Sequence, residues 1–99
     1  MSADSLAKFL EDEIDEDITT VPGVGAAAAK KLAAGDDGVA TTYQLFGRFL
    51  TLKSKGASNS EHCDAMWFWL QGKGVSSHRS GIVQCLVEKV EIMMPGLYQ

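Results

Sequence analysis

Residues 21–32 read VPGVGAAAAKKL, a Gly-X-Gly turn that runs directly into an alanine-rich segment with two lysines. Gly23 and Gly25 have no Cβ and can take positive φ, so the chain can turn tightly at these positions. Valines beside the glycines and Leu32 at helical spacing give the segment a small apolar side of its own. The pattern predicts a turn followed by a helix from about Gly25 to Ala34.

The start of this expected helix has the properties of an anion site. Its first N–H groups have no partner inside the helix, and they lie at the positive end of the helix dipole. Lys30 and Lys31 add two cations further along. We interpret the segment as the turn and second helix of a helix-hairpin-helix, which holds nucleic-acid phosphates and does not read bases. An ordinary helix start after a turn is the alternative. A dinucleotide-binding motif is excluded, because no strand precedes the glycines and no third glycine follows at the required spacing.

Periodicity and capping signals predict an all-α fold, a compact bundle of about five helices. The expected helices cover residues 5–13, 25–34, 41–53, 58–72 and 78–94. Two of them begin with the spacing of a capping box, Thr41 with Gln44 and Ser58 with Glu61. Before Pro22, Thr19 or Thr20 is placed to cap a short turn. The 41–53 segment has apolar residues on more than one face, so we expect part of it to lie centrally or to meet another chain.

The acidity of the chain is confined to its N-terminal segment. The net charge of the 99 residues is −4, of which residues 1–20 contribute −6 and the remainder +2. We therefore expect an acidic N-terminal helix or arm at residues 1–17 and a mildly basic helical domain at residues 18–99. Such a body suits a local phosphate-binding patch better than a general polycation.

Several functional classes are disfavoured by the sequence. Cys63 and Cys85 are too few for a disulfide framework and form no CxxC pair, so we expect both to be reduced and inert. His62 beside Cys63 has no matching pair, and we expect no metal and no cofactor. No nucleophile has a placed base, and the acids at residues 11–17 are typical of a solvated face, so we expect no enzyme. No apolar run could span a bilayer and no signal peptide is present, so we expect a soluble, intracellular protein with no membrane insertion.

A second, weaker turn follows the fourth expected helix. Residues 72–77 read GKGVSS and lead into a helix with His78 and Arg79 in its first turn, similar to the first hairpin. Just before it, Trp67 and Phe68 are expected to fill the core, with a surface for a partner as the alternative.

These residues together resemble the barrier-to-autointegration factor family from about residue 19 to residue 97. The resemblance rests on the hairpin PGVG with KKL, on residues 43–53 (YQLFGRFLTLK), on Trp69-Leu70 and on Cys85-Leu86. It implies a SAM-like helical domain that contains a helix-hairpin-helix, binds double-stranded DNA without sequence preference and is not an enzyme. It also implies a homodimer that bridges two duplexes, a location in the nucleus and also in the cytoplasm, and LEM-domain proteins as partners.

The resemblance assigns roles to individual positions. The expected DNA contacts, with the two lysines of the hairpin helix added, are Gly23, Val24, Gly25, Ala27, Ala28, Lys30, Lys31, Ser77, His78 and Arg79. The expected dimer and partner surface comprises Phe46, Gly47, Phe49, Leu50, Thr51, Leu52 and Lys53.

The chain also departs from the family pattern. Its arm is strongly acidic where the family arm is basic or polar, with Lys8 as its one lysine, and Trp67 and Phe68 stand where the family tends to have charged residues. A protein-interaction module of the same fold with weak or lost DNA binding is therefore the alternative function. An arm that folds over the hairpins and competes with DNA is a further hypothesis.

Overall fold

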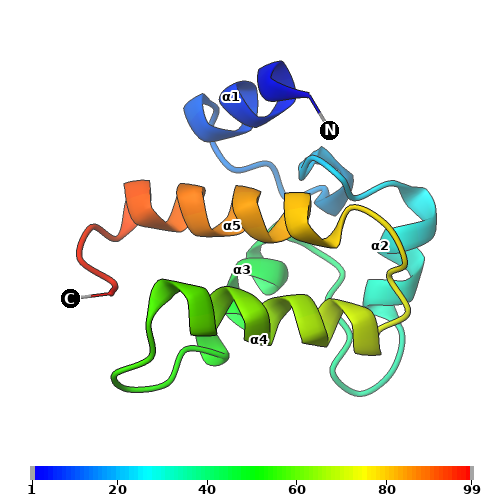
Figure 1. The fold of residues 1–99 in the computed structure, drawn as a ribbon. Coiled ribbons are helices and arrows are strands. Elements are labelled where there is room, and N and C mark those ends of the chain that lie inside the picture. Colours follow the sequence, from blue (N-terminus) through cyan, green and yellow to red (C-terminus); the bar gives the residue numbers. More distant parts are fainter. Residues whose placement is uncertain (1, 99) are drawn as a thin grey trace.

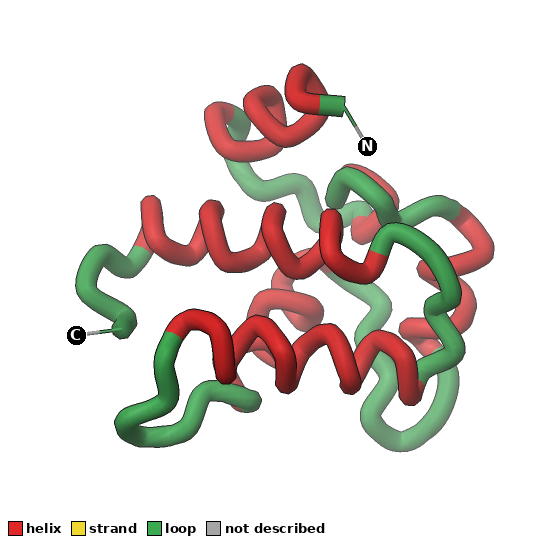
Figure 2. Tube along the Cα trace, viewed as in Figure 1, coloured by secondary structure: helices red, strands yellow, loops and turns green. Residues whose placement is uncertain are grey.

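The computed structural model describes residues 2–98, which form five α-helices and one short 3₁₀ helix (Figures 1 and 2). The elements are α1 (Ala3–Glu11), η1 (Ile18–Thr20), α2 (Ala26–Ala33), α3 (Thr42–Thr51), α4 (Asn59–Gly72) and α5 (Arg79–Met93). Within the described range no strand is formed, and the β-type pairing is limited to an isolated bridge between Asp17 and Thr41. The predicted all-α fold of about five helices is confirmed.

Helix α5 is the centre of the molecule. It contacts α1, α3 and α4, and it runs antiparallel to α4, so that it starts beside the end of α4 and close to α2 (Figure 1). Because its neighbours lie on several sides, its buried residues cover most of its circumference. They are Ile82, Val83, Cys85, Leu86, Val87, Lys89 and Val90.

The acidic arm is docked on the body through α1. Phe9 is buried and stacks on Phe46, with 6.3 Å between the ring centroids. The buried Lys89 ammonium donates to the carbonyls of Leu10 at 2.9 Å and Asp12 at 2.7 Å. The helix starts two residues earlier than predicted because the hydroxyl of Ser2 caps it by accepting from the backbone N–H of Ser5.

One face of α3 belongs to the core, as predicted. Leu45, Phe46 and Phe49 are buried on it, whereas Tyr43 is exposed. The helix ends at Thr51 and not at residue 53, because the chain turns at the next residues with a bond from the N–H of Lys53 to the carbonyl of Leu50.

His62 is a core residue of α4 that joins α3 to the C-terminal turn. Its ring stacks on Phe49 with 4.0 Å between the centroids. Since a carbonyl can only accept, Nε2–H donates to the Phe49 carbonyl at 2.5 Å, and Nδ1 bonds to the Tyr98 hydroxyl at 2.8 Å. Burial raises the pKa of Tyr98 to about 12. Both ring nitrogens of His62 are thus engaged within the protein.

Cys85 is buried, and Cys63 is half-buried with its thiol donating to the Asn59 side chain at 3.2 Å. Burial raises the pKa of the Cys85 thiol to about 11 and also raises that of Cys63. Both thiols are therefore protonated near neutral pH, which disfavours a nucleophilic role.

The expectation that Trp67 and Phe68 fill the core is wrong for Phe68. Its side chain is 62% exposed, while Trp67 is half-buried beside it in an edge-to-face contact at 5.2 Å. Phe68 lies on the outer face of α4, where no neighbouring helix covers it. Sequence periodicity shows which residues share a face with Phe68, but it does not show that this face is exposed unless the neighbours of α4 are known.

Candidate nucleic-acid interface

The first turn exposes backbone because its side chains point into the core. Val21 and Val24 are buried, and the N–H of Val24 donates to the Val21 carbonyl at 2.9 Å. Gly23 has φ +95°, a conformation that favours glycine. The preceding helix of the hairpin is reduced to η1, which is capped by the Asp17 carboxylate and not by Thr19 or Thr20. Asp17 accepts from both the hydroxyl and the N–H of Thr19, and these bonds lower its pKa.

Gly25 opens the N-terminus of α2 to solvent. It is the N-cap residue in an extended conformation, and no side chain caps this end of the helix. A Cβ built on Gly25 would have no atom within 4 Å, so the space beside its backbone is open. The first N–H groups of α2 can therefore donate hydrogen bonds to a ligand that approaches over Gly25, Ala26 and Ala27, all of which are exposed.

The two hairpin lysines lie at the far end of α2. Lys30 and Lys31 are exposed but occupy the last turn of this eight-residue helix. At 1.5 Å per residue they are roughly 6–8 Å along the axis from its start. As cations in the last turn, they interact favourably with the negative end of the helix dipole. The predicted cations are thus present beside the turn, but one and a half turns away from the open N–H groups.

The second turn packs directly on the first. A Cβ at Gly23 would lie 3.2 Å from His78 Cβ and 2.9 Å from Ile82 Cγ1, so the close approach requires glycine. His78 has φ +61°, the one positive φ of a non-glycine residue among residues 2–98. It is the N-cap of α5, and it makes no side-chain cap. The turn predicted from GKGVSS is therefore confirmed as a second helix start beside the first.

The first turn of α2 and the N-cap of α5 line one groove. Both helix starts lie at the same end of the molecule (Figure 1). The groove has a volume of about 520 Å³ and is formed by residues 21–28 with Thr19, Ser77 and His78. The N-termini of α1, α3 and α4 are capped by Ser2, Thr41 and Ser58, with both predicted capping boxes present. Among the α-helices of residues 2–98, the two without a side-chain cap are thus α2 and α5. The first turn of α2 lines the groove, whereas residues 79–81 of α5 line a pocket that shares Ser77 and His78 with it. The two helix starts thus place N–H donors and positive dipole ends in adjoining hollows of the surface, which favours a negatively charged ligand.

Arg79 does not extend into the groove. Its guanidinium donates from Nη1 to the Val75 carbonyl at 2.6 Å and lies 4.5 Å from the centroid of the Trp67 ring. Its Nε is buried without a hydrogen-bond partner. In this structure Arg79 ties the second turn to α4, and the exposed side chains just before it are those of Ser76, Ser77 and His78. This contact could not be predicted from sequence, because it depends on where the fold places Trp67.

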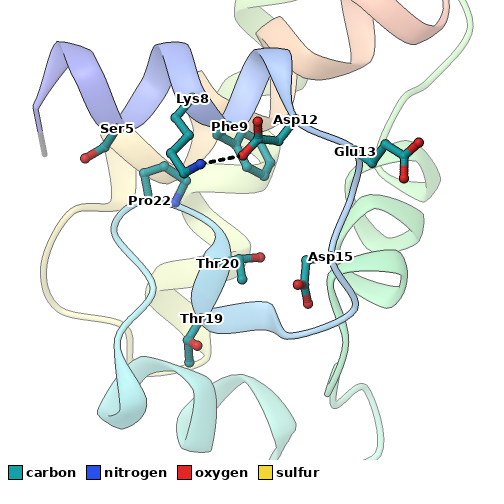
Figure 3. Close-up of a pocket in the computed structure, with 9 residues that line it drawn as sticks. All are labelled: Ser5, Lys8, Phe9, Asp12, Glu13, Asp15, Thr19, Thr20 and Pro22. Atoms are coloured by element: carbon teal, nitrogen blue, oxygen red, sulfur yellow. Dashed lines mark ion pairs between the residues drawn. The ribbon is translucent and has the colours of Figure 1, made fainter.

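An acid-lined cleft adjoins the groove on the side of the arm. It has a volume of about 560 Å³ and lies between α1 and residues 12–22, with Asp12, Glu13 and Asp15 on its wall (Figure 3). Thr19 and Pro22 line both the cleft and the groove. Lys8 is paired with Asp12 at 2.9 Å, and this contact raises the pKa of Lys8. The arm thus lies beside the first turn with its carboxylates and does not offer an unengaged lysine to it.

The residues expected at the dimer and partner surface divide into three groups by exposure. Phe46 and Phe49 are buried inside the chain, 6% and 0% exposed, so they support this surface from within. Gly47 and Thr51 are exposed, and a Cβ at Gly47 would have no atom within 4 Å. The half-buried members are Leu50, Leu52 and Lys53. Tyr43, which was not assigned to the surface, is 58% exposed one turn before Gly47.

Comparison with known proteins assigns the family. The family model for barrier to autointegration factor matches residues 2–93, nearly the whole chain, and includes the arm as well as the hairpins. The chain therefore belongs to the barrier-to-autointegration factor family, and its five-helix fold is consistent with the SAM-like fold of that family. The family is one of non-enzymatic, DNA-binding proteins associated with chromatin in the nucleus. No curated protein and no solved structure matches the chain significantly.

Two further properties bear on the function. None of the helices within residues 2–98 is long and apolar enough to cross a membrane. In the same range, no three His, Cys, Asp or Glu side chains are grouped so that they could hold a metal ion.

Proposed function

We propose that the chain binds double-stranded DNA without sequence preference through the groove, and that a homodimer bridges two duplexes in the organisation of chromatin in the nucleus. The observation that carries the proposal is that two uncapped helix N-termini lie side by side, that of α2 in a groove lined by glycine and alanine and that of α5 in the pocket that adjoins it. Phosphate oxygens satisfy such donors, and they occur on every duplex whatever its sequence. Membership of the family supports the same assignment.

Backbone donors account for binding by a chain with little net positive charge. The groove offers N–H groups from Gly25 to Ala28 and around Ser77 and His78, with Lys30 and Lys31 nearby. If two to four phosphates are held per protomer, the logarithm of the association constant should fall with the logarithm of the salt concentration with a slope of roughly −2 to −4. Base sequence should change the affinity little, since the residues that line the groove include no Arg, Lys, Asn or Gln, the side chains that read a base edge with two hydrogen bonds.

The test is a gel shift with two duplexes of unrelated sequence and a salt titration. Gly25→Glu places a carboxylate where the phosphate would lie, and should weaken binding by at least about tenfold, because a hydrogen bond to a charged group contributes roughly 1.5–3 kcal/mol. Ser60→Glu is the matched control: it adds the same charge in the first turn of α4, at the opposite end of the molecule (Figure 1). Equal binding by Gly25→Glu and Ser60→Glu would exclude the groove as the site.

Bridging requires a second copy, for which α3 offers a surface. Tyr43, Gly47 and Thr51 are spaced one turn apart on its exposed side, and Gly47 leaves room for close approach. A two-fold pair joined through this side would carry two grooves. Sedimentation of the native chain should give a dimer, and addition of a short duplex should give a complex with two duplexes per dimer. Gly47→Glu should yield a monomer that still binds one duplex, and a native chain that sediments as a monomer would refute this part.

LEM-domain proteins are the protein partners that we propose for the surface formed by Gly47, Leu50, Thr51, Leu52 and Lys53. A pull-down with a purified LEM domain tests it, with Gly47→Glu as the variant expected to lose binding. Retention of the LEM domain by the Gly47→Glu variant would place that partner elsewhere.

A protein-interaction module without DNA binding is the second candidate. Two observations favour it: Phe68 is 62% exposed, and three carboxylates of the arm line a cleft that shares Thr19 and Pro22 with the groove. On this view the native chain dimerises but fails to shift DNA even at low salt. Replacing Asp12, Glu13 and Asp15 by their amides distinguishes a weakened site from a lost one. Tighter binding by this variant would mean that the arm competes with DNA, and its failure to bind would favour the module.

A further inference from the structure

A cluster of three side chains ties the end of α2 to the end of α4. Asp37, in the loop after α2, forms an ion pair with Lys73 at 2.6 Å and accepts a hydrogen bond from the Trp69 indole N–H at 3.1 Å. Lys73 also donates to the carbonyl of Ala34, the C-cap of α2, and its ammonium lies 6.0 Å from the centroid of the Trp69 ring. We call Asp37, Trp69 and Lys73 the clamp.

The clamp is held by polar contacts, and its lysine is much less exposed than its carboxylate. The side chain of Lys73 is 10% exposed and that of Asp37 is 47% exposed. The bond from Lys73, together with that from Trp69, holds the pKa of the Asp37 carboxyl below its usual range. Asp37 is therefore charged at neutral pH and engages both of its oxygens. Its neighbour Asp36 is exposed and takes part in no hydrogen bond or ion pair seen among the described residues.

The place of the clamp in the chain connects it with the groove. Lys73 is the C-cap of α4, and residues 74–78 lead from it through the second turn into α5. On the other side, α2 runs from its open N-terminus at Gly25 to Ala34. The clamp therefore fixes the far ends of the two segments whose near ends meet where Gly23 approaches His78. Arg79 adds a separate tie, from the second turn to Trp67.

We propose that Asp37 is a positioning residue for DNA binding, which sets the second turn against the first so that both helix N-termini engage phosphates of the same duplex. This inference rests on the proposed function of the groove. It makes a prediction opposite in sign to simple electrostatics. Removing a negative charge from a DNA-binding protein should strengthen binding through the general field of the molecule, whereas loss of the clamp should weaken it.

The experiment compares Asp37→Ala with Asp36→Ala. The two variants have the same net charge and alter adjacent residues of one loop, so the field they present to DNA is nearly equal. We expect Asp36→Ala to bind a short duplex as well as the native chain or up to twofold tighter. We expect Asp37→Ala to bind at least fivefold more weakly and to show a smaller salt slope, because phosphate contacts of the second turn are lost. Binding is measured well below the unfolding temperature of each variant.

Two further measurements separate positioning from general stability. Asp37→Ala, but not Asp36→Ala, should shift the amide NMR signals of residues 76–81, which connect the second turn to α5. Trp69→Phe keeps an aromatic side chain and every charge but removes one bond to Asp37, so it should weaken DNA binding in the same direction, by about twofold. This variant keeps the test decisive if Asp37→Ala does not fold.

Failure of this inference can be distinguished from failure of the proposed function. If the native chain binds DNA and Asp37→Ala binds as tightly as Asp36→Ala, the clamp is structural only and this inference is overturned, while the proposed function stands. If the native chain binds no DNA, the proposed function fails and the inference fails with it.

Discussion

Gly23 and Gly25 are two positions apart, yet their replacement by alanine should have separate effects. At Gly23 the backbone has φ +95°, and an added Cβ would lie 2.9 Å from Ile82 Cγ1. The left-handed conformation costs a residue with a Cβ about 1–2 kcal/mol. Overpacking in a core costs about 1–3 kcal/mol more. Gly23→Ala should therefore lower the free energy of unfolding by roughly 2–5 kcal/mol.

At Gly25 the same change meets open space and an ordinary backbone. Its φ of −93° and ψ of −175° suit any residue. Alanine is a poorer N-cap than glycine by about 0.5–1 kcal/mol. It also restricts the unfolded chain, which stabilises the fold by about 0.4–1 kcal/mol, so the two effects nearly cancel. The methyl group would nevertheless occupy the approach of a phosphate, and losing one charge-assisted hydrogen bond weakens binding by roughly tenfold or more.

Thermal unfolding and fluorescence anisotropy with a labelled duplex measure the two effects. At about 4–8 °C per kcal/mol for a domain of this size, Gly23→Ala should lower Tm by at least about 8 °C and Gly25→Ala should change it by less than about 4 °C. Gly25→Ala should bind the duplex more weakly at a temperature where it is fully folded. Equal losses of Tm in the two variants would refute the geometry of the turn. A Gly25→Ala variant that is stable and binds as the native chain does would refute the assignment of the groove.

Three further changes test the arm, the cap of η1 and the hairpin lysines. Phe9→Ala removes a ring packed on Phe46 and should lower the free energy of unfolding by about 3 kcal/mol in urea titration; a loss below about 1 kcal/mol would mean that α1 is not docked. The hydroxyl and N–H of Thr19 hold the pKa of Asp17 below its usual value, so Asp17 stabilises the fold at neutral pH and loses this effect as the pH falls through the lowered pKa. The gap in Tm between the native chain and Asp17→Asn should thus be constant from pH 6 to 8 and close below about pH 4, the usual pKa of Asp; a gap that widens in acid would contradict the assignment. Lys30→Ala should reduce the salt slope of DNA binding by about 0.9 if it contacts one phosphate, and an unchanged slope would place it off the interface.

Local chemistry made much of the fold predictable. Both capping boxes were found from sequence, because the cap and its partner are three residues apart and need no tertiary context. The two open helix starts are also visible in the sequence, since Gly25 and His78 stand at N-cap positions without a side chain that caps the helix. Asp17 carries the same kind of signal, and it was missed because the threonines after it are also capping residues.

Contacts between distant segments decided what sequence could not predict. Arg79 was expected at DNA, but it is drawn toward Trp67 and the Val75 carbonyl by a cation–π contact and a hydrogen bond. Phe68 was expected in the core, but it faces away from the neighbours of α4. Periodicity marks which residues share a face of a helix, and only the packing of other helices decides which face is buried.

Lys89 has a consequence for the order in which the chain acquires its structure. The carbonyls it binds precede it by 79 and 77 positions, and they end a helix of nine residues whose last residue is acidic. A helix of that length is marginal alone in water, and a negative charge at its C-terminus weakens it further. During synthesis, residues 3–11 leave the ribosome well before Lys89, the cation that completes their helix. This helix therefore becomes ordered only after the residues of α5 have been made.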